Sequence, residues 1–137
     1  MKLLIIISGS IAAKKCKEIL KQLTKKGVLI NCIITNSAKK MVSVNDIKNN
    51  IKGKIFYDSS ETKNKMLHIS LSRNADLVAV CPATANIIAK FANGLADDLA
   101  SNTLIASNKQ VLFMPAMNMQ MWENKINKHN VLKLQNS

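Results

Sequence analysis

The sequence predicts one doubly wound α/β domain, and three observations support this prediction. Apolar runs of strand length alternate with segments of helical periodicity along the chain. The segments between successive apolar runs are long enough for the crossovers that a parallel sheet requires. The 137 residues, 47% of them hydrophobic, suit one domain with one core. We therefore expect a single domain over residues 1–137.

The first half of the chain begins with a continuous apolar run at residues 2–7, which is typical of a strand buried on both faces. The spacing then predicts a helix over 11–26 that ends at Gly27, a residue suited to a helix C-cap. Its expected inward-facing residues are Ile11, Ile19, Leu20 and Leu23. The elements expected next are a strand at 28–35, a short helix at 36–42 capped by Asn36-Ser37, a helix at 44–51, a strand at 55–57 and a loop at 58–65.

The second half repeats the alternation. A helix over 66–74, with Met66, Leu67, Ile69 and Leu71 partly buried, precedes an apolar strand at 76–80 that Cys81-Pro82 is expected to break. The remaining expected elements are a helix from Thr84 to about Phe91, a helix from Asp97-Asp98 to about Ser107, a strand at 110–114, and helices at 118–123 and 125–134. The whole pattern predicts a Rossmann-like or flavodoxin-like three-layer sandwich with a parallel sheet.

Composition excludes several classes of function. No apolar run reaches the roughly 18 residues that cross a bilayer, and the apolar start ends early at Ser8-Gly9-Ser10. The net charge is +12, but the lysines are scattered and few aromatic residues lie among them, so we expect no nucleic-acid partner. Cys16, Cys32 and Cys81 show no metal-binding spacing and are expected to be reduced thiols in a cytoplasmic protein. We expect neither a metal site nor a membrane partner.

Four loops follow expected strands, and ligands of such sheets bind beyond the carboxyl ends of the strands. All four are rich in small or hydroxyl-bearing residues, which admit a ligand close to the backbone and bind phosphate. The loops are Ser8-Gly9-Ser10-Ile11-Ala12-Ala13, Thr35-Asn36-Ser37, Cys81-Pro82-Ala83-Thr84-Ala85-Asn86 and Met114-Pro115-Ala116-Met117-Asn118. Taken one at a time, Asn36 and Thr84 are explained equally well as helix caps. The first loop is neither GxGxxG nor a P-loop, so a mononucleotide or flavin mononucleotide (FMN) fits better than a dinucleotide.

Few residues suggest acid–base chemistry. His68 lies at an expected helix start, where spacing alone favours a surface or capping role, although a general base is the alternative. His129 lies in a polar helix and is expected to be exposed. No Ser-His-Asp or Cys-His arrangement is present, and Asp97-Asp98 is explained by favourable charge at a helix start.

Six segments together resemble the flavin-containing cysteine decarboxylases over nearly the whole chain. They are residues 8–13, His68-Ile69-Ser70-Leu71, Ala75-Asp76-Leu77-Val78, Pro82-Ala83-Thr84-Ala85-Asn86, residues 92–99, and residues 115–122. The last segment, Pro-Ala-Met-Asn-Met-Gln-Met-Trp, matches the PxMNxxMW signature of that family in full. Within the family the likeness is strongest to the domain that decarboxylates phosphopantothenoylcysteine in bacterial coenzyme A biosynthesis.

The resemblance implies FMN as cofactor and assigns residues to it by position. The implied FMN contacts are Gly9, Ser10, Ile11, Thr35, Ser37, Thr84, Ala85, Asn86, Ala116 and, less strongly matched, Arg73. His68 takes the place of the catalytic histidine, and Asn118, with Met117 beside it, takes the place of the asparagine that holds the cysteine carboxylate. The resemblance also implies a homotrimer or a dodecamer of trimers, with FMN bound between subunits.

The implied reaction is FMN-dependent decarboxylation of (R)-4′-phosphopantothenoyl-L-cysteine, a phosphorylated small-molecule cysteine conjugate. Relatives continue past the position of Ser137 through another strand and a flap whose cysteine completes the final reduction; Cys16, Cys32 and Cys81 lie in other segments. A shortened protein, a decayed gene product and one part of a split enzyme all remain open. Two further alternatives are a peptidyl-cysteine decarboxylase, which stops at the enethiol, and a non-catalytic FMN-binding or regulatory subunit. A flavin prenyltransferase fits the PxMNxxMW match less well.

Overall fold

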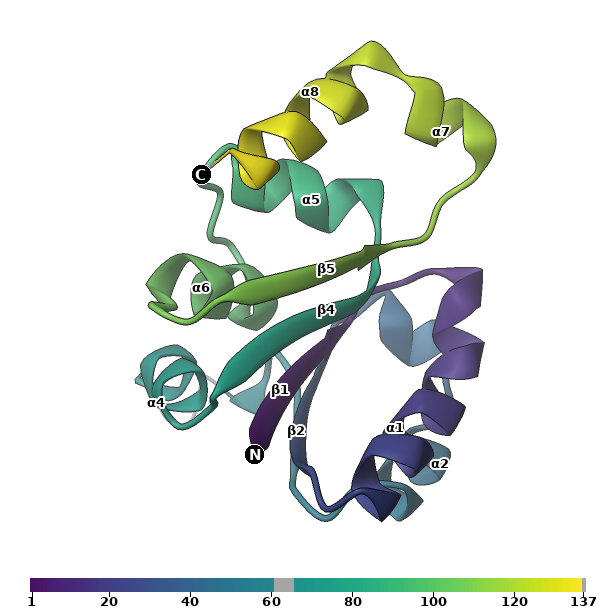
Figure 1. Ribbon diagram of the computed structural model, residues 1–137, viewed down its shortest axis with the longest axis vertical. Coiled ribbons are helices and arrows are strands. Elements are labelled where there is room, and N and C mark those ends of the chain that lie inside the picture. Colours follow the sequence, from purple (N-terminus) through teal and green to yellow (C-terminus); the bar gives the residue numbers. More distant parts are fainter. Residues whose placement is uncertain (61–65, 137) are drawn as a thin grey trace.

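A five-stranded parallel sheet forms the centre of the computed structural model, which describes residues 1–60 and 66–136. The strand order is β3-β2-β1-β4-β5, which is a doubly wound order. Strands β2 and β3 are added on one side of β1, and strands β4 and β5 on the other, so the winding changes direction between β1 and β4. The strands are β1 (Lys2–Ile7), β2 (Leu29–Ile34), β3 (Ile55–Phe56), β4 (Leu77–Ala83) and β5 (Val111–Pro115). The predicted α/β three-layer architecture is confirmed (Figure 1).

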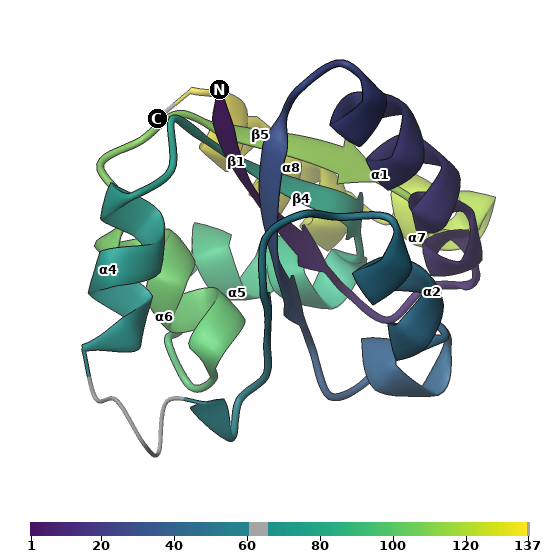
Figure 2. The same ribbon diagram turned by 90° about the horizontal axis from the view of Figure 1, so that it is seen from below.

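Helices cover both faces of the sheet (Figures 1 and 2). On one face lie a 3₁₀ helix (Ile11–Lys15), α1 (Cys16–Lys25), a second 3₁₀ helix (Ala38–Lys40) and α2 (Val44–Asn49). On the other lie α4 (Leu67–Arg73), α5 (Ala85–Ala92) and α6 (Leu99–Ala106). The chain ends with α7 (Met119–Glu123) and α8 (Lys125–Gln135), which packs beside α5. Among the described residues, no helix is long and apolar enough to cross a membrane.

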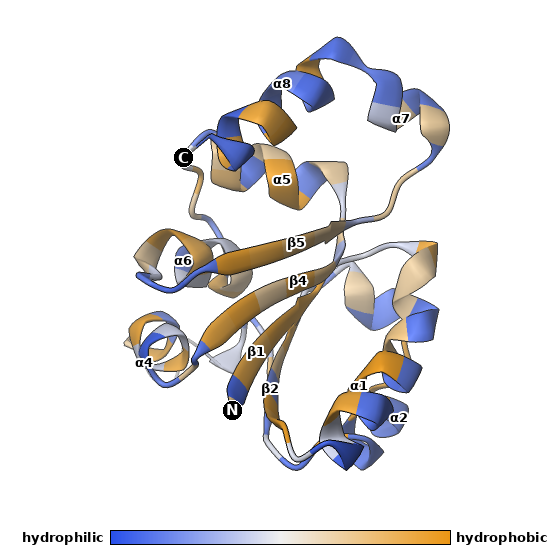
Figure 3. Ribbon diagram, viewed as in Figure 1, coloured by the Kyte–Doolittle hydropathy of each residue, from blue (hydrophilic) through white to orange (hydrophobic). Residues whose placement is uncertain are grey.

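Two apolar clusters hold the layers together, one on each face of the sheet. Successive residues of a strand belong alternately to one cluster and to the other. Leu3, Ile5 and Ile7 of β1 pack against the α1 and α2 side, while Leu4 and Ile6 pack against the α4, α5 and α6 side. Successive strand side chains point to opposite faces, so a strand buried on both faces has to be apolar throughout. Figure 3 shows this: the strands are coloured hydrophobic, while polar residues concentrate on the helices.

Several helix boundaries and caps agree with the sequence. Gly27 has φ +87°, the left-handed conformation that a residue after a helix end requires. Thr84 caps α5 by accepting a hydrogen bond from the N–H of Ile87 at 3.3 Å. Asp98 caps α6 in a capping box with Ser101, so its role as a helix-start residue is confirmed. His129 is exposed on α8, as expected.

Other expectations were wrong. Ile11 was expected to face inward but is 78% exposed, because the chain from Ile11 to Lys15 forms a 3₁₀ helix, whose period of three residues differs from that of an α-helix. Ile19 (36%) and Met66 (60%) are also exposed. Asn36 does not cap a helix: its amide donates to Asp58.

The expected break at Cys81-Pro82 was also wrong, because β4 continues to Ala83. The pairing of β4 with β5 shifts register between Val80 and Ala83, and this shift accommodates a residue that has no backbone N–H to donate. The loop expected at residues 58–65 lies partly outside the described residues.

Candidate active site

A polar cavity of about 390 Å³ opens at the carboxyl ends of β1, β2 and β4. We call it the strand-end cavity. Four of the residues that the family resemblance assigned to the cofactor line it, namely Thr35, Ser37, Thr84 and Asn86. The other lining residues are Ser8, Asn36, Asp58, Ile87, Lys90, Asp97 and Asp98. The loops after three strands thus meet around one cavity, as expected for a parallel α/β sheet, whose ligands bind beyond the carboxyl ends of the strands.

Ser8 connects two of these loops. It is only 3% exposed, its hydroxyl donates to the carbonyl of Pro82 at 2.5 Å, and the same oxygen accepts from the N–H of Thr84 at 3.1 Å. The hydroxyl therefore ties the end of β1 to the start of α5. Sequence reasoning quoted Ser8 within its loop but did not select it. The sequence feature that could have identified Ser8 is its position as the first polar residue after an apolar strand.

The loops after β1 and β2 are in contact at Gly9. A Cβ atom added at Gly9 would lie 2.6 Å from Cβ of Ser37, which is closer than real Cβ atoms approach. Only glycine therefore allows these two loops to meet without movement. Ser10, the next residue, caps the 3₁₀ helix by accepting from the N–H of Ala12. The hydroxyl of Thr35 lies 3.4 Å from the hydroxyl of Ser37. It also accepts a hydrogen bond from the N–H of Ala38.

Charged groups occupy the far wall of the strand-end cavity and are paired. The Lys90 ammonium lies 2.9 Å from a carboxylate oxygen of Asp97 and 3.4 Å from one of Asp98. The hydrogen bond to Asp97 raises the pKa of Lys90, and the same bond lowers the pKa of Asp97. Asp58 accepts from the Asn36 amide at 2.9 Å and from the N–H of Leu99 at 3.0 Å. The hydroxyl-rich wall is therefore the part best suited to an anionic ligand.

Two buried thiols, Cys16 and Cys81, lie close together. Cys16 Sγ donates to the carbonyl of Cys81 at 3.2 Å. The interaction between the two cysteines lowers the pKa of Cys81 and, together with burial, raises the pKa of Cys16. Burial alone raises the pKa of Cys32 to about 12. All three cysteines are free, and the described residues contain no cluster of His, Cys, Asp and Glu that could hold a metal ion.

The loop after β5 forms a second site, next to the first. Asn118 caps α7 by accepting from the N–H of Met121 at 2.9 Å, and its side chain is exposed. It lines a groove of about 420 Å³ together with Ala85, which the sequence assigned to the cofactor. Ala116 is held against β4 by a hydrogen bond from its N–H to the carbonyl of Ala83 at 3.1 Å. Met117 is half-buried and packs against the α5 and α6 side of the core.

His68 and Arg73 lie on α4 and line neither of these spaces. Figure 2 shows α4 and α7 on opposite sides of the molecule. The structure therefore gathers four of the residues that the resemblance assigned to FMN around the strand-end cavity, with Ala85 in the neighbouring groove. It does not bring α4, which carries His68, next to α7, which Asn118 caps, within one chain.

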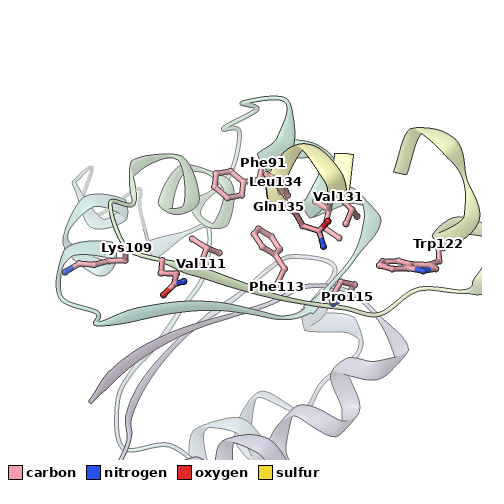
Figure 4. Close-up of a pocket in the computed structure, with 11 residues that line it drawn as sticks. Phe91, Lys109, Val111, Phe113, Pro115, Trp122, Val131, Leu134 and Gln135 are labelled. Carbon is pink, nitrogen blue, oxygen red and sulfur yellow. The ribbon is translucent and has the colours of Figure 1, made fainter. Parts of the chain in front are cut away.

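A larger cavity, of about 670 Å³, lies elsewhere, between β5, α5 and α8 (Figure 4). Its walls are mainly apolar, with the rings of Phe91 and Phe113 stacked at a centroid distance of 5.7 Å. Lys109 is the one charged side chain among its lining residues. Size alone favours this cavity as a ligand site, but the smaller strand-end cavity is lined by hydroxyls and borders the N-terminus of α5, which are groups of the kind that bind phosphate.

Comparison with known proteins shows the family of the chain. The family model described as Flavoprotein matches residues 1–137. A probable phosphopantothenoylcysteine decarboxylase of Streptococcus mutans is 35% identical over 137 residues, which cover 97% of this chain and 76% of that protein. The coenzyme A biosynthesis bifunctional protein of Vibrio cholerae is 35% identical over 136 residues, or 97% of this chain. The chain spans only 34% of the length of that bifunctional protein.

Solved structures with the same fold include three cysteine decarboxylases. The FMN-dependent cysteine decarboxylase TvaF from thioviridamide biosynthesis superposes with a TM-score of 0.93 at 25% identity, covering 99% of this chain and 85% of that one. A mutant PPC decarboxylase complexed with pantothenoylaminoethenethiol gives 0.89 at 29% identity, with 98% and 77% covered. The peptidyl-cysteine decarboxylase EpiD gives 0.87 at 28% identity, with 98% and 80% covered.

Proposed function

We propose that this chain, which belongs to the flavoprotein family, catalyses the FMN-dependent decarboxylation of (R)-4′-phosphopantothenoyl-L-cysteine. One observation carries the proposal: a hydroxyl-lined cavity at the carboxyl ends of three strands lies beside the loop that presents Asn118. The family and the solved relatives indicate a flavin cofactor. The substrate is proposed because the S. mutans relative, matched over 76% of its length, is named for it.

The residues of the strand-end cavity fit the phosphate end of FMN. The close approach at Gly9 leaves the backbone of the first loop open, and hydroxyls of Ser37 and Thr84 line the cavity. The N-terminus of α5 points into the same region behind its Thr84 cap, and a helix N-terminus favours a bound anion. Bound there, FMN would supply the electron-accepting chemistry that removes a hydride from the carbon bearing the thiol.

The protein residues position the substrate and move its protons. Asn118 uses its Oδ1 to cap α7, so its N–H₂ group is available to bind the cysteine carboxylate that leaves as CO₂. Met117 packs beside it and supports the loop. His68 accepts the proton of the substrate thiol. The protein thus contributes orientation and proton transfer, and the cofactor contributes the redox step.

We also propose that the site is completed between copies of the chain, in a homotrimer or an assembly of trimers. Because α4 and α7 lie on opposite sides of one chain, His68 reaches a bound substrate only from a second copy (Figure 2). Two apolar residues beside the proposed site, Ile11 (78% exposed) and Met119 (79%), would be buried by such contacts.

The proposal is tested by the visible spectrum of the purified protein and by CO₂ release from phosphopantothenoylcysteine. We expect a yellow protein that releases CO₂, and a His68→Asn variant that keeps its flavin and loses activity by at least about a hundredfold, the usual contribution of a general base. His129→Asn is the matched control, since His129 is exposed on α8. A colourless protein that takes up no added FMN would exclude the proposed function.

A peptidyl-cysteine decarboxylase is the second candidate, because EpiD, which bears that name, superposes nearly as well as the PPC decarboxylase. A peptide that ends in cysteine, assayed beside phosphopantothenoylcysteine, separates the two. Faster CO₂ release from the peptide would favour the second candidate. A yellow protein that acts on neither substrate would indicate a non-catalytic flavin-binding subunit.

A further inference from the structure

The lysines of this protein are scattered along the sequence but unevenly distributed in the fold. Residues 14–54 contain eleven of the 19 lysines and only two of the eight acidic residues, so this part of the chain carries a net charge of +9 out of +12. It includes α1, α2 and the second 3₁₀ helix, which form the helical layer on one face of the sheet. The fold therefore gathers most of the net positive charge on one side of the molecule.

Nine lysines of the helices in this layer are exposed, and we call the surface that they form the basic face. They are Lys14, Lys15, Lys17, Lys21, Lys25, Lys26, Lys39, Lys40 and Lys48. Three of them, Lys17, Lys21 and Lys25, recur every four residues, so they follow one side of α1 at intervals of about 6 Å. The lysines of α1 are therefore arranged as a row.

The helices of the basic face lie side by side (Figure 1). The Lys17 ammonium on α1 lies 3.8 Å from a carboxylate oxygen of Asp46 on α2. At the other end of α1, the hydroxyl of Thr24 donates to the carbonyl of Asn50, the residue after α2, at 2.8 Å. The lysines of the two helices therefore belong to one continuous surface.

Little negative charge opposes the basic face. Asp46 is paired with Lys17, and both side chains are more than half exposed. Glu18 is the only other acidic residue between residues 14 and 54. In the opposite helical layer, by contrast, the Lys90 ammonium is paired with two carboxylates. A second copy of the chain presenting the same face would be repelled, so the surface favours an anionic partner.

The neutral groups of the basic face distinguish a nucleic acid from a membrane. Exposed hydroxyl and carboxamide groups of α1 and α2 lie among the lysines, at Gln22, Ser43, Asn45 and Asn49, and such groups contact phosphate oxygens in nucleic-acid complexes. Apart from Ile11, at the start of the first 3₁₀ helix, Ile19 is the only large apolar side chain of these helices that is exposed. Stable membrane anchoring takes an apolar or lipid anchor in addition to basic residues, so the face fits a phosphate polymer better than a bilayer.

We propose that the basic face binds the phosphate backbone of a nucleic-acid duplex without reading its sequence. Lysines that neutralise phosphates release counterions, and this release drives binding. Residues 14–54 contain neither arginine, which reads guanine by paired hydrogen bonds, nor an aromatic residue on which single-stranded bases stack. The spacing of lysines in the sequence did not reveal this surface. The inference is independent of the proposed function, since none of the nine lysines lines the strand-end cavity.

Fluorescence anisotropy of a short labelled DNA duplex, titrated with the purified protein at several salt concentrations, tests the proposal. We expect a Kd of about 1–100 µM near physiological salt, the same for two duplexes of unrelated sequence and steeply weakened by added salt. The triple variant Lys21→Gln, Lys25→Gln, Lys48→Gln should bind at least about tenfold more weakly at low salt. Its slope of log K against log salt should be shallower by up to about 2.7, since each lost phosphate contact removes about 0.9.

A second triple variant, Lys125→Gln, Lys128→Gln, Lys133→Gln, is the matched control. It removes three exposed lysines from α8 and so has the same net charge as the first variant. It should bind the duplex within about twofold of the wild-type protein, because its lysines lie outside the basic face. Circular dichroism establishes that both variants are folded.

Equal weakening in the two triple variants would overturn the assignment to the basic face, because net charge alone would then explain the binding. A wild-type protein that binds no duplex at low salt would overturn the proposal outright, as would tighter binding to a single strand than to the duplex of the same sequence. Vesicles of phosphatidylcholine and phosphatidylserine are the second probe. Wild-type protein that bound these vesicles and not the duplex would show that the face is a membrane surface and that the proposal is wrong.

Discussion

The strand-end cavity and the flank formed by β5, α7 and α8 are built differently. In the strand-end cavity, the polar groups bond to one another, as Ser8 does to Pro82 and Thr84. On the flank, apolar side chains face outward, including Leu112 at 50% and Met119 at 79% exposed. The polar groups that Ser8 joins are therefore paired within one chain, whereas the apolar surface of the flank is not buried by the chain's own fold.

This difference matters for the proposed site because its two ends lie in the two regions. The cofactor end depends on backbone turns that the core holds in place. The substrate end depends on Asn118, which is exposed on a short helix. Figure 3 shows β5 coloured as hydrophobic as the central strands, although it is an edge of the described sheet. Substitutions in the cavity should therefore change stability, and substitutions on the flank should change association or binding.

Ser8→Val should produce the largest effect. It replaces the buried hydroxyl by a methyl group, adds a second methyl group to Cβ, and leaves the Pro82 carbonyl and the Thr84 N–H without their partner. We expect about 3 kcal/mol less free energy of unfolding, since each unsatisfied buried group costs about 1–3 kcal/mol. Urea denaturation measures it, with Ser37→Ala, an exposed hydroxyl on the same cavity, as the control. An equal loss of free energy of unfolding in the two variants would contradict the role of Ser8 in joining the two loops.

Gly9→Ala should have the next largest effect. The added methyl group would lie 2.6 Å from Cβ of Ser37, so the two loops must separate. Overpacking of this kind costs about 1–3 kcal/mol, and the loops bordering the strand-end cavity should lose flavin affinity at the same time. Ser37→Gly combined with Gly9→Ala should recover part of the loss. Denaturation and flavin retention measure both effects, and a double variant no better than Gly9→Ala would contradict the contact.

Leu112→Thr on β5 should barely change stability. Leu112 is half exposed, and threonine keeps the preference for a strand. We expect the free energy of unfolding to change by less than about 0.5 kcal/mol, as for most surface substitutions. The corresponding change at Leu4, which is 1% exposed, should cost several times more. Similar losses at both positions would show that the flank is as buried in solution as the core.

Asp97→Asn should give the smallest effect, and only in acid. The hydrogen bond from Lys90 holds the pKa of Asp97 below its usual value of 3.8. A carboxyl with a lowered pKa in the folded state stabilises the fold above its unfolded pKa, and this stabilisation is lost as the pH falls through the folded value. Asp97 is exposed, so solvent weakens the effect. Denaturation midpoints of the two proteins should converge below about pH 4; a gap that widens in acid would contradict the pairing.

Local patterns in the sequence predicted much of the fold. The run Lys2–Ile7 is a strand with the bounds expected from its apolar residues, because a strand buried on both faces has no polar positions. Gly27 and Thr84 ended and began helices as expected, since caps depend on neighbouring residues only. Ile11 and Pro82 were misjudged, because a 3₁₀ turn and a register shift depend on how the chain packs.

The sequence by itself determined the alternation of strands and helices, the small and polar loops at the strand ends, and the Asn118 loop, because each is encoded within a few neighbouring residues. Only the tertiary structure decided that Ser8 joins Thr84, 76 residues away, and that a buried oxygen of Asn127 has no hydrogen-bond partner among the described residues. It also decided that α4, which carries His68, and α7, which Asn118 caps, lie on opposite sides of the molecule (Figure 2). Hydrogen bonds and burial depend on distances between remote segments, and those distances exist only once the sheet has assembled.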